Sequence, residues 1–239
     1  MIISLHSPKA GGSSFKDLLQ KHFGLSLLSD YADIPINKSF KERTKDVLKF
    51  NDNFNLLKRL EYKARRIKCI HGHFLPYKYQ KLLNKKNTFF ITWLREPTER
   101  LISHYYYWQR TYNENCAPLH KRVVEESWSL EKFCLSEEME NFYGKFLWKF
   151  PIEKFDFIGI TEHFEDDVSF FAKNYLKDYK INHVPKKNTN PNNSGFYSDK
   201  ISKELFSNIK SFHSKDYEMY EYALEKRKER IKSMLNNKH

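Results

Sequence analysis

The sequence contains no apolar stretch that approaches the length of a membrane-spanning helix. Its first residues, Met-Ile-Ile-Ser-Leu-His, lack the basic region and long apolar run of a secretory signal peptide. The three cysteines, Cys69, Cys116 and Cys134, are too few for a disulfide framework. We therefore expect a cytoplasmic protein in a reducing environment, without a transmembrane segment.

Glycine is also scarce, with 7 in 239 residues, so the adjacent pair Gly11-Gly12 stands out. Hydrophobic residues make up 40% and aromatic residues 16% of the chain, which excludes global disorder and allows a substantial core. The net charge of +12 favours a polyanionic partner such as nucleic acid, an acidic polysaccharide or a phosphorylated cofactor, or is simply a solvated basic surface.

Short apolar, β-prone runs at 2–5, 67–74, 88–94 and 155–160 alternate with helical patterns. This alternation predicts a single α/β domain over residues 1–239, with three layers around a central parallel sheet. We expect a helical insertion at about 30–66, a helix at 78–86, a loop at 182–196, and two C-terminal helices that break near His213.

The segment at 7–15, Ser-Pro-Lys-Ala-Gly-Gly-Ser-Ser-Phe, joins a predicted strand to a predicted helix. Small residues let backbone N–H groups approach a phosphate, and the helix N-terminus adds a positive dipole. Gly11 and Gly12 allow φ values that other residues avoid. Lys9 precedes the glycines, whereas the ATP-type signature places lysine after them, so a kinase loses support. The alternative is an ordinary glycine-rich turn.

A second cluster begins at Arg95, directly after the predicted buried strand at 88–94. Arginine suits bidentate contact with phosphate, and ligands of open α/β sheets bind at the carboxyl ends of the strands. On the following helix, Ser103 shares a face with Arg100. Arg95 and Ser103 are therefore candidates for a second phosphate site. The alternative is that Arg95 or Arg100 pairs with neighbouring glutamates, Glu96 or Glu99.

Four segments resemble the sulfotransferases that use 3′-phosphoadenosine 5′-phosphosulfate (PAPS). Residues 6–15 resemble their 5′-phosphosulfate loop, and residues 94–108 resemble their 3′-phosphate motif, Arg-x-Pro-x-x-Arg-x-x-Ser. The Cys-Ile-His-Gly-His-Phe segment at 69–74 is similar to the carbohydrate branch that includes heparan sulfate 2-O-sulfotransferase, and 155–164 matches a later segment of that branch.

This resemblance implies a sulfotransferase fold with a P-loop-like turn, PAPS as donor, a hydroxyl acceptor on a saccharide, and no metal. It implies that Lys9 contacts the sulfuryl group and bridging oxygen, that Arg95 and Ser103 hold the 3′-phosphate, and that His73 is the catalytic base. The residues implied to cradle the 5′-phosphate are Ala10, Gly11, Gly12, Ser13 and Ser14. The candidate substrate contacts are His71, Arg100 and Tyr106.

The proposed roles also agree with elementary chemistry. Histidine has an ordinary pKa of about 6.5, so a neutral His73 is available as a base near neutral pH, and Lys9 supplies a fixed cation beside the leaving oxygen. Two alternatives remain at 69–73: Cys69, His71 and His73 ligate zinc from one face of a strand, or both histidines are packed and structural.

Two other classes of function also remain open. The first is a polyanion-binding module without catalysis, which would show steep salt dependence and no need for PAPS. The second is a divergent nucleotide kinase, which would need ATP and Mg²⁺. If the sulfotransferase hypothesis holds, nucleic acid is not a partner.

Overall fold

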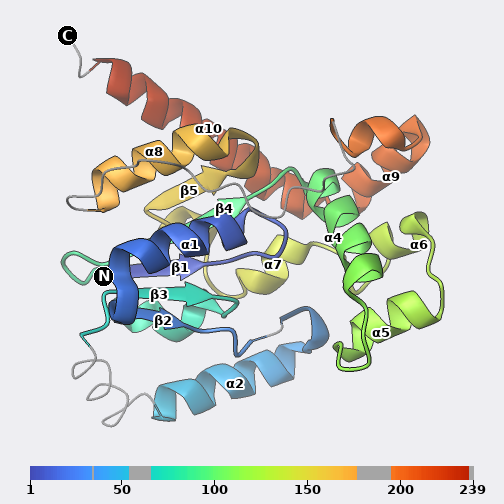
Figure 1. The fold of residues 1–239 in the computed structure, drawn as a ribbon, viewed down its shortest axis with the longest axis horizontal. Helices are drawn as coiled ribbons and strands as arrows, with labels where there is room; N and C mark the ends of the chain where they lie inside the picture. The colour runs from blue at the N-terminus through green and yellow to red at the C-terminus, as the bar shows by residue number, and fades with distance from the viewer. Residues whose placement is uncertain (34, 54–65, 177–194, 237–239) are drawn as a thin grey trace.

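The computed structural model describes residues 1–33, 35–53, 66–176 and 195–236. Its centre is a five-stranded sheet in the order β2-β3-β1-β4-β5, in which every pairing is parallel (Figure 1). The strands are β1 (Ile2–Leu5), β2 (Leu27–Ser29), β3 (Cys69–Gly72), β4 (Phe89–Leu94) and β5 (Phe157–Ile160). The predicted α/β class with a central parallel sheet is therefore confirmed.

Both faces of the sheet are covered, because alternate residues of each strand point into different core clusters. Ile2 packs on one face with helices α1 (Gly12–Phe23) and α8 (Phe164–Tyr175). Ile3 packs on the other face with α4 (Pro97–Thr111), α7 (Phe142–Phe146) and α10 (Ser214–Asn236). Burial on both faces explains why the strands read as continuous apolar runs.

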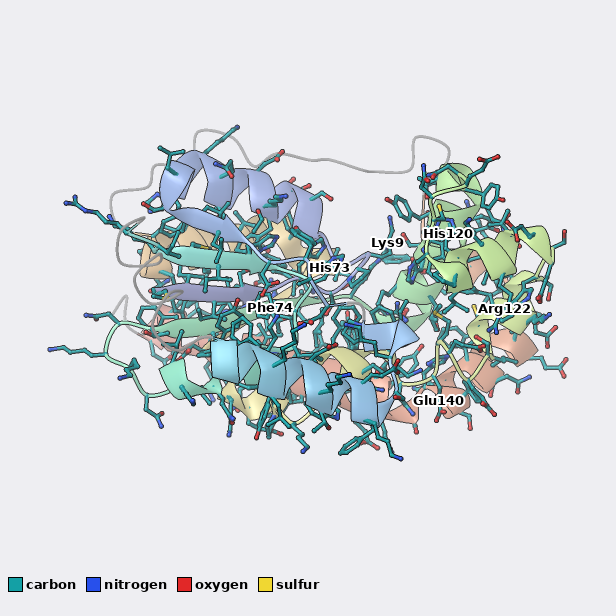
Figure 2. The ribbon with its side chains drawn as sticks, turned by 90° about the horizontal axis from the view of Figure 1, so that it is seen from below. Lys9, His73, Phe74, His120, Arg122 and Glu140 are labelled. Carbon is teal, nitrogen blue, oxygen red and sulfur yellow. The ribbon has the colours of Figure 1, made fainter. Side chains whose placement is uncertain are left out.

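The remaining helices surround this framework, and α5, α6 and α9 lie beyond one end of the sheet (Figure 1). The remaining α-helices of the described residues are α2 (Phe40–Asn53), α5 (Pro118–Glu125), α6 (Leu130–Cys134) and α9 (Lys203–Phe212). The 3₁₀ helices are Gly24–Ser26, Pro35–Asn37, Pro76–Leu82, Ile152–Lys154, Thr161–His163 and Ser198–Lys200. Figure 2 shows His120, Arg122 and Glu140 on that side, away from the sheet.

Several local predictions can now be compared with the structure. The break between the C-terminal helices falls at His213, as predicted, and the buried Nε2 of His213 bonds the Cys134 carbonyl (2.7 Å). The insertion predicted at 30–66 contains the 3₁₀ helix Pro35–Asn37 and α2. Residues 34 and 54–65 lie outside the described residues, as does most of the loop at 182–196. The helix predicted at 78–86 is a 3₁₀ helix at Pro76–Leu82. The short strand β2 was not predicted.

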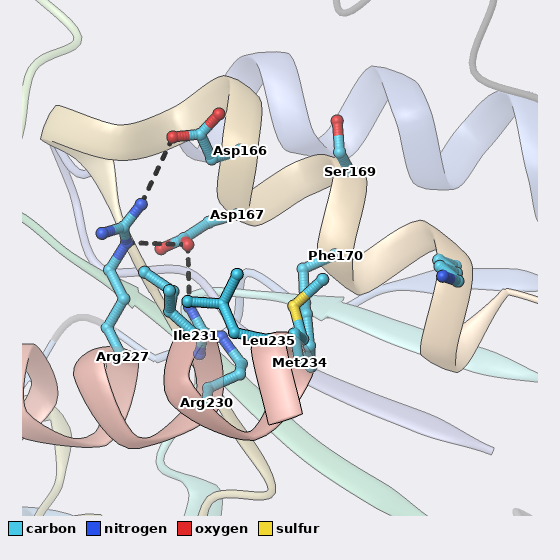
Figure 3. Close-up of a pocket in the computed structure, with 10 residues that line it drawn as sticks. Asp166, Asp167, Ser169, Phe170, Arg227, Arg230, Ile231, Met234 and Leu235 are labelled. Atoms are coloured by element: carbon cyan, nitrogen blue, oxygen red, sulfur yellow. Dashed lines mark hydrogen bonds and ion pairs between the residues drawn. The ribbon is translucent and has the colours of Figure 1, made fainter. Parts of the chain in front are cut away.

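Helix α10 protects the edge of the sheet at β5. Arg230 donates a hydrogen bond to the Ile158 carbonyl (3.2 Å) and pairs with Asp167 (2.7 Å). Arg227 joins the same carboxylate (2.9 Å), as Figure 3 shows. A charged side chain bonded to the outer carbonyl of an edge strand prevents further strand pairing there. In the described part of the chain, no helix is both long and apolar enough to cross a membrane.

Gly159 in β5 tests how tightly this sheet is packed. A Cβ added at Gly159 would lie 2.5 Å from the ring of Trp93, which is buried on the adjacent strand. We expect Gly159→Ala to lower the free energy of unfolding by about 1–3 kcal/mol, since overpacking strains a core. Gly144→Ala in α7 is the control, because its Cβ would meet nothing closer than 3.9 Å. Urea unfolding measures both, and equal effects would contradict the packing argument.

Candidate functional site

Three neighbouring strands bring the predicted site residues to one edge of the sheet. The central strand β1 leads into the turn that contains Lys9, β3 on one side ends just before His73, and β4 on the other side ends just before Arg95. Because the strands are parallel, all three sets of residues lie at the carboxyl edge, where ligands of open α/β sheets bind. Figure 2 shows Lys9 and His73 beyond this end of the strands.

The turn after β1 leads into the N-terminus of α1 without a side-chain cap. Lys9 and Gly11 adopt left-handed conformations, with φ of 67° and 75°. Gly11 is the N-cap and carries no side chain, so no side-chain cap bonds the first N–H groups of α1. Ala10 is buried under the turn. Backbone N–H groups at a helix N-terminus are a general feature of anion sites, so the predicted role of this turn stays a prediction.

Glycine is required at positions 11 and 12 for different physical reasons. Gly11 has a positive φ, as expected, but Gly12 does not, because it is already helical; the expectation that both need unusual φ values is wrong for Gly12. A Cβ at Gly12 would instead overlap the ring of His6, at 1.8 Å from its Nε2. Beyond them, Ser13 is exposed and Ser14 is buried.

Lys9 lies among other cations. Its Nζ sits 4.1 Å from the ring centroid of Tyr107 on α4. Burial, followed by the charges of Arg110 and Arg95, lowers the pKa of Lys9 to about 8. A bound anion would stabilise the protonated form of a lysine that is partly buried near other cations.

Arg95 is held firmly but keeps some exposure. Its backbone N–H donates to the Tyr143 hydroxyl (2.9 Å), which also bonds the Arg95 carbonyl (2.5 Å). Its guanidinium lies 3.3 Å from Glu99 and 4.0 Å from Glu162, and 5.7 Å from the ring centroid of Tyr197. The salt bridge to Glu99 that formed our alternative interpretation is therefore present, and a phosphate would compete with it.

The other predicted residues lie on helix α4, where some are buried and one is exposed. Ser103 is buried on this helix, while Tyr106 is 40% exposed and stacks on Tyr197 with centroids 5.8 Å apart. Arg100 is fully buried, with its guanidinium 3.8 Å from the ring centroid of Phe142. All three guanidinium nitrogens of Arg100 are buried without a hydrogen-bond partner among the described residues, and its contact with substrate stays a prediction.

Three histidines cluster at the end of β3. The ring centroid of His6 lies 4.6 Å from that of His73 and 5.4 Å from that of His71. His71 Nδ1 hydrogen-bonds Ser4 Oγ (2.9 Å), whereas Nε2 of both His71 and His73 is buried without a hydrogen-bond partner among the described residues. The ring of Tyr31 covers His73 at 4.8 Å. His71 is 1% exposed, which favours a packed, structural role for it.

The backbone around His73 is fixed by the segment that follows β2. The Asp33 N–H donates to the His73 carbonyl (3.2 Å), and the Asp33 carboxylate accepts from the Leu75 N–H and from Lys78, both at 2.9 Å. Gly72 must be glycine, because a Cβ there would lie 1.7 Å from the Asp30 carbonyl oxygen. The His-Gly-His sequence thus allows β2 to approach closely.

The charge state of these histidines follows from their burial. Burial, followed by the nearby Lys16, lowers the pKa of His73 to about 4; burial, then His73 and Lys16, lowers that of His71 to about 3. The pKa of His6 is also well below its ordinary value, chiefly through burial. All three rings are therefore neutral at pH 7, and a neutral His73 is able to accept a proton.

The structure gives no support to the zinc alternative. Cys69 lies in the core on the face of α1, and burial raises the pKa of its thiol, which disfavours the thiolate that binds metal. Within the described ranges, no group of three or more His, Cys, Asp or Glu side chains is arranged to hold a metal ion.

Sequence reasoning missed four residues near this site: His6, Lys16, Tyr31 and Arg110. Arg110 carried a usable signal, since it follows Ser103 and Tyr107 on one face of a helix. His6 directly precedes the turn, but only its contact with Gly12 gives it meaning. Tyr31 comes from a region without any motif.

Comparison with models of known protein families finds no match, and no curated protein matches the sequence. The fold and the geometry of the edge are therefore the basis for any functional argument.

The burial of His213 predicts how the free energy of unfolding changes with pH. His213 is fully buried, and its Nδ1 accepts the Asn141 N–H (3.3 Å), so burial lowers its pKa to about 4. The unfolded chain binds this proton near pH 6.5 and the folded chain only near pH 4, so His213 removes stability as pH falls between these values, by about 1.4 kcal/mol per pH unit.

We therefore expect the loss of stability between pH 6.5 and 5 to be smaller in His213→Gln than in the wild type, measured by urea unfolding at each pH. Burial raises the pKa of Asp216 to about 6 and contributes with the opposite sign in this range, so the difference between the two proteins is the informative quantity. Equal pH slopes would show that His213 does not titrate in this way.

Proposed function

We propose that this protein is a PAPS-dependent sulfotransferase that transfers a sulfuryl group to an acceptor hydroxyl on a saccharide. The observation that carries the proposal is that the adjacent strands β3, β1 and β4 bring three of the four segments that resemble this family to one edge of the sheet. Parallel pairing brings strand ends together in any such sheet, so the support lies in which residues meet there: Lys9, His73 and Arg95 follow the three central strands.

The turn after β1 suits the 5′-phosphosulfate end of the donor. The N-terminus of α1, which has no side-chain cap, offers N–H groups to the 5′-phosphate. Lys9 lies at the same turn. Its pKa is lowered to about 8 by burial and by the charges of Arg110 and Arg95, so it loses its proton more easily than an ordinary lysine. A donor with several negative charges would relieve this repulsion and keep Lys9 protonated beside the bridging oxygen.

The start of α4 suits the 3′-phosphate. Arg95 stands one strand away from the turn, keeps part of its guanidinium exposed, and has its backbone fixed by Tyr143. Ser103 lies on the same helix and is the proposed second contact. A 3′-phosphate at Arg95 would replace Glu99 as its partner, and a dianion competes well for a guanidinium.

In the proposed reaction the acceptor oxygen attacks sulfur in line with the bond to the leaving phosphate oxygen. The new O–S bond forms as the S–O bond to the phosphate breaks, and the phosphate oxygen leaves with the electron pair as adenosine 3′,5′-bisphosphate. His73 takes the acceptor's proton. Neutral His73 is available at pH 7 because its pKa is about 4 in the free protein. The proposal requires no metal.

The donor site is tested by calorimetric titration with adenosine 3′,5′-bisphosphate, without added metal. We expect micromolar binding by the wild type and at least tenfold weaker binding by Arg95→Ala, because a charged phosphate contact is lost. Arg122→Ala is the control, since Arg122 lies on α5 and pairs with Glu138. ATP titrated with Mg²⁺ tests the kinase alternative.

Two results would contradict this assignment. A preference for ATP with Mg²⁺ would favour a kinase, and binding that depends steeply on salt but not on the bisphosphate would favour a polyanion-binding module.

The base is tested with His73→Ala. We expect this variant to lose at least a hundredfold in sulfuryl transfer from PAPS, because general base catalysis contributes about 10²–10⁴-fold. Binding of the bisphosphate should change less than threefold. His22→Ala, at the far end of α1, is the matched control. Transfer of ³⁵S from PAPS to a panel of saccharides measures the activity, and a variant that keeps most of it would place the base elsewhere.

A further inference from the structure

His6 lies between the turn and the predicted base. It follows β1 directly, and its backbone N–H donates to the Gly72 carbonyl at the end of β3 (2.8 Å). Its ring occupies the place where a side chain at residue 12 would stand: the Cβ of an alanine there would be 1.8 Å from Nε2 and 1.9 Å from Cδ2 of His6. Only glycine at position 12 leaves room for this ring.

The other side of the His6 ring packs on the neighbouring histidines. It is nearly parallel to the His71 ring, at 19° and 5.4 Å between centroids, and it contacts the tilted His73 ring at 4.6 Å. His6 Nδ1 is buried without a hydrogen-bond partner among the described residues. A single ring thus touches both the start of α1 and His73.

We propose that His6 is a positioning residue: its ring is a spacer that holds His73 at a fixed distance from the start of α1. This inference rests on the proposed function, in which α1 binds the donor and His73 takes the acceptor's proton. His73 Nε2 has no hydrogen-bond partner among the described residues, and its ring packs against the rings of His6, Tyr31 and Phe146.

The spacer role differs from a catalytic role in what the ring must contain. A spacer needs only a flat ring of the right size, whereas a base needs a nitrogen. A ring that is removed leaves a cavity into which His73 turns, and small displacements of a reacting group slow catalysis strongly. The donor phosphates, bound by backbone N–H groups and Arg95, would be affected much less.

The first experiment compares His6→Ala with His6→Phe in sulfuryl transfer and in bisphosphate binding. We expect kcat to fall at least tenfold in His6→Ala and less than threefold in His6→Phe, with binding changed less than threefold in both. Equal large losses in both variants, together with the loss of one limb of the pH–rate profile, would make His6 a base. Unchanged kcat in His6→Ala would also overturn the proposal.

The second experiment needs neither activity nor ligand. Gly12→Ala should lower the midpoint of thermal unfolding in the wild type, because the new methyl group meets the His6 ring. In the His6→Ala background the same change should leave the midpoint unchanged or raise it, since alanine favours a helix over glycine. An equal cost in both backgrounds would mean that the His6 ring is not what Gly12 accommodates.

The two experiments separate the two proposals. Failure of the wild type to bind adenosine 3′,5′-bisphosphate or to transfer sulfate would refute the proposed function while the unfolding cycle still measured the contact between His6 and Gly12. A functional wild type in which the cycle shows no coupling would refute only the role of His6.

Discussion

The pairing of β1 on both sides is the interaction on which the rest of the structure depends. This strand of four residues is buried on both faces and hydrogen-bonded to β3 and to β4. In register, Leu5 stands beside Gly72 and Thr92, so β1 and β3 end at the same level and β4 extends two residues further, to Leu94. Parallel pairing alone therefore brings together a turn, a histidine and an arginine from distant parts of the sequence.

At this edge of the sheet, the cation of Lys9 lies partly buried near two other cations, Arg95 and Arg110. Lys9 lies over the ring of Tyr107, and burial, followed by the charges of Arg110 and Arg95, lowers its pKa, so its surroundings disfavour the cation. The nearby carboxylate of Glu99 pairs with Arg95 and also accepts the Ser198 N–H (2.8 Å), so it serves partly as a structural anchor. An arrangement that costs energy without a ligand is common at functional sites.

Sequence patterns predicted those features that depend on local periodicity and failed where contacts between distant segments decide. The apolar run of β4, the arginine after it and the break at His213 were visible in the sequence. The three residues of β2 were too few to give a pattern, and the role of Gly12 depends on the ring of His6. The contact between the Arg100 guanidinium and the ring of Phe142, 3.8 Å from the ring centroid, likewise joins segments that no local pattern connects.

The low pKa of His73 has a consequence for the proposed chemistry. A base with a pKa of about 4 is weak, and burial together with the charge of Lys16 makes it so in the free protein. An anionic donor at the start of α1 would lie near Lys16, offset its charge, and raise the pKa of His73 toward the value at which a general base works best. In the proposed enzyme, the donor would therefore strengthen the base that its own reaction requires, and His6 is the ring through which the two parts of the site touch.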